Sequence, residues 1–147
     1  MEQKDFVASV FKTFDLKLNT LAERIAFQKT VYLLQKFGSG TNFRFVWHNF
    51  GPYSSELARI GFSLNEIDKL NASILDIESS RKLIQIKEGQ KGNSKFLEMM
   101  SDIIYLYDGK KINEKELFQI LINHQSYLND QDLFKLALQR LRAFNLL

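Results

Sequence analysis

The residues of this chain best able to do chemistry lie around its single tryptophan and single proline. His48 and Ser54 flank the Gly51-Pro52 pair and could meet across a turn as general base and nucleophile. A catalytic triad also needs an orienting acid and an oxyanion site, and the sequence marks neither. We therefore expect no catalytic residue and a protein that is not an enzyme.

Metal and cofactor chemistry has equally little support. The two histidines, His48 and His124, fall in different predicted elements without an acidic residue at ligand spacing, and the chain has no cysteine. Asp76 and Glu78 share one face of a predicted strand, a pattern more typical of solvated carboxylates than of an acid–base pair. No glycine-rich phosphate-binding motif is present. The sequence predicts no metal site and no cofactor.

Composition describes an ordinary globular chain. With 147 residues, 45% hydrophobic and 25% charged, we expect a single domain over residues 1–147 with a core rich in aromatic rings. The net charge of +3 permits contact with nucleic acid without requiring it. No apolar run approaches the roughly 18–20 residues of a membrane span. We expect a cytoplasmic protein with no membrane partner.

The first half of the chain predicts two helices, over residues 4–14 and 20–37. Thr20 and Glu23 fit a capping box, and the second helix is apolar nearly all round, as is typical of a central helix. Arg24, Gln28 and Gln35 form its one polar stripe. Either this stripe is a solvent edge, or it forms a buried polar cluster in which Gln28 pairs with backbone at the Gly-Pro corner.

A strand and a corner follow. Phe43, Phe45 and Trp47 alternate with polar or smaller residues, which is the period of a half-buried strand. We expect Phe45 and Trp47 to pack on the second helix. Gly51-Pro52 should turn the chain, and Ser54 or Ser55 should cap a short helix. Ser63 with Glu66 fits a capping box for another short helix that reaches residue 70.

The second half predicts a hairpin, a loop and three helices. Residues 74–77 and 83–86 are rich in β-branched side chains and are expected to pair as strands. Residues 87–95 read as an exposed loop, followed by helices over 94–107, 113–127 and 130–144, the last two capped by Asn113 and Asp130. The fold class is mainly α (α+β): a winged-helix-like helical domain with a small β-hairpin and extra C-terminal helices.

Basic residues cluster around the predicted hairpin and loop; they are Arg81, Lys82, Lys87, Lys91 and Lys95. A basic wing of this kind can contact phosphate. Glu78, Glu88 and Glu98 are interleaved with them, so a solvated face is the favoured interpretation. A winged-helix regulator that binds nucleic acid through this hairpin and loop is the alternative function.

A family resemblance rests on the run from Gln28 to Leu34, then Phe45-Val46-Trp47, then Phe50-Gly51-Pro52-Tyr53-Ser54. These motifs resemble the Panacea domain of SocA-like antitoxins and the related YwgA-like proteins, over residues 21–61. The resemblance implies a mostly helical domain without catalytic residues, which in antitoxins neutralises a toxin. The matching positions have an implied structural role; they are Gln28, Lys29, Tyr32, Trp47, Gly51, Pro52 and Ser54.

The sequence thus favours a non-enzymatic interaction module, a Panacea- or YwgA-like regulator or antitoxin that binds a partner protein, with a toxin as one candidate. Thr30-Val31 stands where those antitoxins more often carry leucines, and residues from 74 onward match nothing in the family. Nucleic acid and a second copy of the chain remain open as further partners.

Overall fold

The computed structural model describes residues 2–75, 77–89, 94–108 and 110–147. Its helices are α1 (Gln3–Phe14), α2 (Leu21–Lys36), α3 (Ser55–Ser63), α4 (Glu66–Leu70), α5 (Ile77–Gly89), α6 (Ser94–Tyr107), α7 (Glu114–His124) and α8 (Gln131–Ala143). A 3-10 turn, η1 (Ser126–Leu128), joins α7 to α8. The strands β1 (Val46–His48) and β2 (Gly51–Tyr53) form one antiparallel hairpin. The expected mainly α fold with a small hairpin is confirmed.

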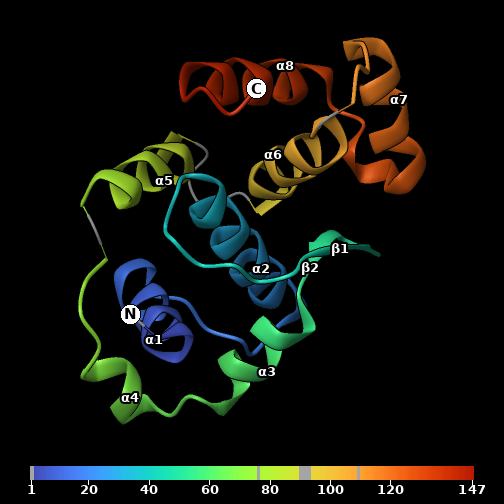
Figure 1. Ribbon diagram of the computed structural model, residues 1–147. Helices are drawn as coiled ribbons and strands as arrows, with labels where there is room; N and C mark the ends of the chain where they lie inside the picture. Colours follow the sequence, from blue (N-terminus) through green and yellow to red (C-terminus); the bar gives the residue numbers. More distant parts are fainter. Residues whose placement is uncertain (1, 76, 90–93, 109) are drawn as a thin grey trace.

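Helix α2 lies at the centre of the arrangement (Figure 1), with α1, α3 and α4 on one side and α6, α7 and α8 on the other. It begins as predicted, because the Thr20 hydroxyl accepts from Glu23 N and the Glu23 carboxylate accepts from Thr20 N. Every residue of its second half from Phe27 to Leu34 is buried. A helix that is apolar on all faces buries its side chains only when other elements pack on every side of it, which explains the central position of α2.

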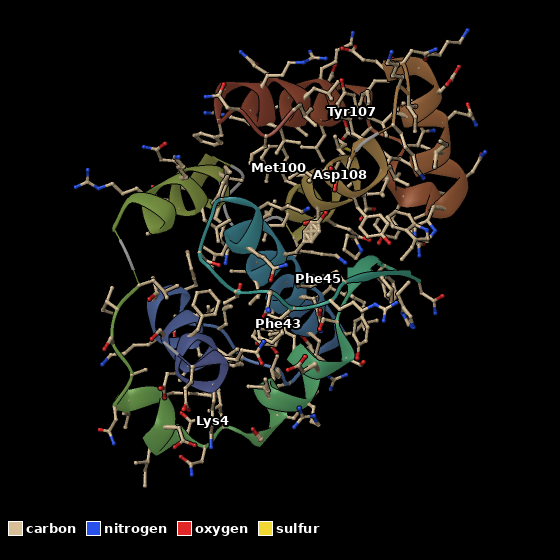
Figure 2. All side chains as sticks on the ribbon, viewed as in Figure 1. Lys4, Phe43, Phe45, Met100, Tyr107 and Asp108 are labelled. Atoms are coloured by element: carbon tan, nitrogen blue, oxygen red, sulfur yellow. The ribbon has the colours of Figure 1, made fainter. Side chains whose placement is uncertain are left out.

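The chain leaves α2 through Gly38 and Gly40, both at positive φ, and then runs back along the same helix. Figure 2 labels Phe43 and Phe45 on this returning segment. Phe43 is buried, and the Phe45 ring meets the Tyr32 ring edge-on with centroids 5.0 Å apart. The predicted strand over 43–48 is therefore shorter than expected, since only Val46–His48 pairs with a neighbour.

The hairpin predicted for residues 74–86 is wrong. Residues Ile77–Gly89 form helix α5, which packs on α2 and α6. Leu83 and Ile86, spaced at a helical interval, are fully buried. Burial of these side chains outweighs the few tenths of a kcal/mol by which β-branched residues disfavour a helix. The wing of the expected winged-helix plan is thus a helix, and the observed hairpin lies at residues 46–53.

The expected loop over 87–95 is also wrong at its two ends. Lys87 and Glu88 continue α5, and Ser94 and Lys95 open α6. Residues 90–93 lie outside the described part of the chain. The predicted capping box of Ser63 with Glu66 is replaced by one between Asn65 and Asp68, whereas the Ser63 hydroxyl donates to Ile60 O at the end of α3.

The C-terminal helices form as expected. The Asn113 and Asp130 side chains accept from Glu116 N and Leu133 N at the starts of α7 and α8. Helix α7 ends at His124, earlier than predicted, where the chain tightens into η1. Within the described residues, every helix is too short or too polar to cross a bilayer.

Candidate functional site

The Gly51-Pro52 corner does not turn the chain as predicted, because both residues lie in strand β2 and the hairpin turns at Asn49-Phe50. Trp47 pairs with Pro52, and His48 pairs with Gly51. Gly51 has a φ of +93°, which side chains disfavour, and a Cβ at this position would lie 1.9 Å from Asp102 Oδ1. Only glycine fits here, for both reasons.

Amide side chains of α2 hold the two segments that pass over it. Gln28 donates from Nε2 to Ser54 O and accepts from Ser54 N, both at 2.9 Å. Gln35 pairs in the same way with Phe43, donating to its carbonyl at 3.0 Å and accepting from its N–H at 2.9 Å. Arg24 is exposed and donates to Leu18 O and Asn19 O. The buried interpretation of the polar stripe is therefore correct for Gln28 and the solvent interpretation for Arg24, whereas Gln35 is half-buried.

Lys29 of α2 hydrogen-bonds the backbone of the corner. Its side chain is buried, and its Nζ donates to Pro52 O at 2.7 Å. Burial is the largest influence on this amine and lowers its pKa from 10.5 to about 8, against the opposing fields of Asp102 and Glu98. The family resemblance implied a structural role for Lys29, and the contact with the corner is consistent with that role.

Two carboxyl groups of α6, Glu98 and Asp102, share this buried region. Glu98 accepts a hydrogen bond from the Tyr127 hydroxyl, whereas neither oxygen of Asp102 has a hydrogen-bond partner among the described residues. Burial raises the pKa of both carboxyls, and for Asp102 the rise is large. We name Lys29, Glu98 and Asp102 the buried charge cluster.

The sequence interpretation missed Glu98 and Asp102 as members of this region, since it treated Glu98 as a solvated charge and did not single out Asp102. A signal was present. The two acids stand four residues apart in the run 96–104, which is otherwise almost entirely apolar, so they share one face of a buried helix. Acids on the buried face of an apolar helix need a partner, and Lys29 on the facing helix α2 is the nearby cation.

His48 and Ser54 do not form the base–nucleophile pair that the sequence allowed. The Ser54 hydroxyl accepts from Leu57 N and caps α3, as one of the two predicted caps. The His48 ring is exposed and stacks on Tyr53 with centroids 4.9 Å apart. Each residue thus has a structural contact of its own, and the described residues bring neither to an oxyanion site.

Trp47 packs against the C-terminal helices. Its half-buried ring contacts Tyr105 of α6 and His124 of α7, with centroid distances of 5.4 and 4.4 Å. The buried Nε2 of His124 has no hydrogen-bond partner among the described residues, and burial lowers the pKa of this ring. Trp47 therefore ties the hairpin to the C-terminal helices.

An apolar cavity of about 240 Å³ opens beside the corner, between the start of α2, the hairpin and α3. We name it the corner groove and define it by Leu21, Arg24, Ile25, His48, Gly51, Tyr53 and Phe62, with Lys29 also in its lining. Leu21 and Phe62 are 54% and 62% exposed, although both are large apolar side chains. Their exposure makes the groove the part of the site that a partner can reach.

The basic residues predicted around a wing do not form one patch. Arg81 is exposed on α5, but the Lys82 and Lys87 amines lie over the rings of Phe37 and Phe14, at 6.0 and 5.4 Å from the centroids. Lys95 Nζ lies 3.6 Å from Asp130 Oδ2. Lys91, like Asp76, is outside the described residues. All three described lysines of this set thus contact groups of their own chain.

Comparison with known proteins gives no family for the chain. A scan against protein-family models finds no match, and comparisons with curated proteins and with solved structures find none either. The function must therefore be inferred from the chain's own geometry: a rigid corner, a buried charge cluster below it and an open apolar groove beside it.

Proposed function

We propose that this chain is a non-enzymatic protein-interaction module, a regulator or antitoxin of the Panacea or YwgA-like kind, and that its partner protein docks in the corner groove. The observation that carries the proposal is the exposure of Leu21 and Phe62 at the mouth of an apolar cavity. Large apolar side chains left in water around a concavity are typical of interaction sites.

The size of the groove favours a protein partner over a small-molecule cofactor. Its volume of about 240 Å³ lies below the roughly 300–1,000 Å³ of most small-molecule sites, but it suits one or two anchoring side chains. Interfaces commonly obtain most of their affinity from a few such anchors.

The rigidity of the groove supports the same role. The bonds of Gln28 to Ser54 and of Lys29 to Pro52 hold one wall in place before any partner arrives. A preformed site loses less conformational entropy on binding than a mobile one.

Binding is tested with three variants. Leu21→Asp and Phe62→Asp place charge in the groove, and Ile67→Asp is the matched control, because Ile67 is 67% exposed and lies outside the groove lining. We expect native lysate to yield a protein retained by the wild type and by Ile67→Asp and lost with both groove variants. Identical retention by all four proteins, or none by any, would contradict the proposal.

The antitoxin role has its own test in genomic context. We expect a neighbouring gene whose product is toxic when expressed alone and harmless when expressed with this chain. Protection should disappear with Leu21→Asp and persist with Ile67→Asp. An isolated gene, or protection that is insensitive to the groove, would argue against this role.

The nucleic-acid alternative has no specific support among the described residues. Its expected basic hairpin is a helix, and Lys82, Lys87 and Lys95 are engaged within the chain. Retention on duplex DNA at low salt that falls steeply with added salt, and is lost on Lys82→Glu with Lys87→Glu, would restore it.

A further inference from the structure

The charged side chains of the corner groove are all of one sign. Arg24 and Lys29 are its charged residues, His48 adds an exposed imidazole, and no aspartate or glutamate belongs to its lining among the described residues. The rest of the lining is almost entirely apolar, with Leu21, Ile25 and Phe62 among its members. The groove therefore combines apolar walls with a rim where Arg24 favours negative charge, whereas Asp102 and Glu98 already lie near the Lys29 amine of its floor.

The hydrogen-bonding capacity of these basic groups is only partly used. Arg24 donates through Nε and Nη2 to two backbone carbonyls, which leaves Nη1 without a hydrogen bond among the described residues. The exposed His48 ring makes its stacking contact with Tyr53 and no hydrogen bond to the described residues. Lys29 contributes one described bond, to Pro52 O, out of three possible donors. Unused donors beside an apolar cavity are suited to a carboxylate.

Arg24 also lies where it can contact both a carboxylate and an adjoining apolar group of a ligand. Its guanidinium carbon lies 6.0 Å from the centre of the Phe62 ring, so the cation stands at the edge of the apolar mouth. Because the two carbonyls of Leu18 and Asn19 hold the guanidinium in place, little side-chain entropy remains to be lost on binding.

We propose that the occupant of the corner groove is an acidic, apolar-anchored segment of a partner protein: one large apolar side chain enters between Leu21 and Phe62, and flanking aspartate or glutamate side chains lie against Arg24 and His48. This inference rests on the proposed function and adds the chemistry of the partner. The apolar anchor supplies most of the affinity, and the charges select the partner and speed its association.

The experiment is a selection of random displayed peptides on the immobilised full chain. We expect the retained peptides to share an aromatic or branched apolar residue flanked by acidic residues. A selected peptide, synthesised with a fluorophore, should bind at least about tenfold more tightly than the same peptide with its acids changed to amides. Its affinity should fall with added salt, because the rim charges are solvent-exposed.

Charge reversal at the rim supplies the sharpest control. His48→Glu changes an exposed residue without a described side-chain hydrogen bond, so it should fold normally and favour peptides with basic flanks. Arg24→Glu should act in the same direction, and retained helix content by circular dichroism will show whether loss of its two carbonyl contacts has disturbed the fold. Ile67→Asp should leave the selection unchanged.

The outcomes separate the partner's chemistry from the docking site itself. Apolar anchors without acidic flanks, or flanks that ignore His48→Glu, would overturn this inference and leave the groove as a docking site. Peptides selected equally by the wild type and by Leu21→Asp, or no enrichment at all, would overturn the groove as the docking site.

Discussion

Two sets of polar side chains lie beneath the same Gly51-Pro52 corner, and they are satisfied very differently. On α2, the Gln28 amide uses both its carbonyl and its amino group on Ser54. On α6, both oxygens of Asp102 are buried without a described hydrogen bond, close behind Gly51. A neutral amide can match a backbone N–H and C=O together, whereas a carboxylate can only accept. The Gln28 amide therefore holds the corner in place through hydrogen bonds. The Asp102 carboxyl group makes the stability of the corner depend on charge and on the room left behind Gly51.

The close approach of Gly51 to Asp102 should give the largest effect. Gly51→Ala would place a Cβ 1.9 Å from Asp102 Oδ1 and 3.3 Å from Lys29 Nζ, at a φ of +93°. We expect a loss of about 4 kcal/mol in the free energy of unfolding, from backbone strain and overpacking together. Chemical denaturation measures this loss.

Gly40→Ala is its matched control, since Gly40 has a φ of +87° and no atom within 4 Å of the added Cβ. Only the backbone strain should remain, about 1 kcal/mol. Equal losses for the two variants would mean that the contact with Asp102 has no energetic role.

Removal of the cation should be the next largest effect. Lys29→Met keeps the length of the side chain but deletes the donor to Pro52 O and the only cation of the buried charge cluster. We expect a loss of about 3 kcal/mol in the free energy of unfolding at neutral pH, because buried carboxyls are then left without a positive neighbour.

A double-mutant cycle tests that reason. Lys29→Met combined with Asp102→Asn should be less destabilised than the sum of the two single variants, because the uncompensated charge is gone. Additive losses would indicate that Lys29 acts through Pro52 alone.

Loss of the Gln28 amide should lower the free energy of unfolding less than loss of the Lys29 amine does. Gln28→Leu leaves the buried Ser54 N without its described partner and removes one of the two described donors to Ser54 O, which Ala58 N also reaches at 3.1 Å, and we expect a loss of about 2 kcal/mol. Gln35→Leu removes the corresponding bonds to Phe43 and one from the Thr41 hydroxyl, all partly buried, where water can replace them, and should cost about 1 kcal/mol. Thermal or chemical unfolding of the two variants measures the difference, and a reversed order would contradict the burial argument.

The last effect is a change in the pH dependence of stability. Burial raises the pKa of Asp102 well above its ordinary 3.8. The folded chain therefore keeps a proton that the unfolded chain releases, and stability falls as pH rises above that ordinary value. The slope is at most about 1.4 kcal/mol per pH unit for this group.

The Asp102→Asn variant has no ionisable group at position 102, whereas the Glu98 carboxyl is present in both the wild type and the variant. Unfolding free energies between pH of about 4 and about 6 should therefore fall more steeply for the wild type than for Asp102→Asn. Lys29 does not contribute a slope in this window. Its lowered pKa of about 8 costs stability as pH falls from 10.5 to about 8, and below that range the amine is protonated in both the folded and the unfolded chain. Parallel curves would show that Asp102 does not carry the pH dependence.

Local signals in the sequence predicted much of the fold. Thr20 with Glu23, Asn113 and Asp130 mark helix starts through side-chain bonds that span three residues, so no distant contact is needed to form them. The apolar surround of α2 likewise identified a central helix, because no other place satisfies it. Residues 74–86 could not be assigned in this way, since their β-branched side chains are compatible with either element, and burial of Leu83 and Ile86 decided the matter.

The candidate site was predicted only in part. The role of the Gln28 amide could be anticipated, because irregular backbone leaves groups that a nearby polar side chain can satisfy, but the turn itself lies at Asn49-Phe50 and not at Gly51-Pro52. Asp102 and the groove could not be located in the same way, since both depend on which helix faces which. Trp47 shows the same limit: its aromatic character indicated burial, but its actual neighbours, Tyr105 and His124, lie far along the chain.

The sequence by itself determined the helix starts, the central helix and the concentration of rare residues around Gly51-Pro52. These depend on periodicity, capping and backbone stereochemistry, which act over a few residues. Only the tertiary structure decided that Lys29, Glu98 and Asp102 share one buried region, and that Leu21 and Phe62 stay exposed beside it. Such juxtapositions follow from the packing of α2 against α6 and α3, which no local pattern specifies.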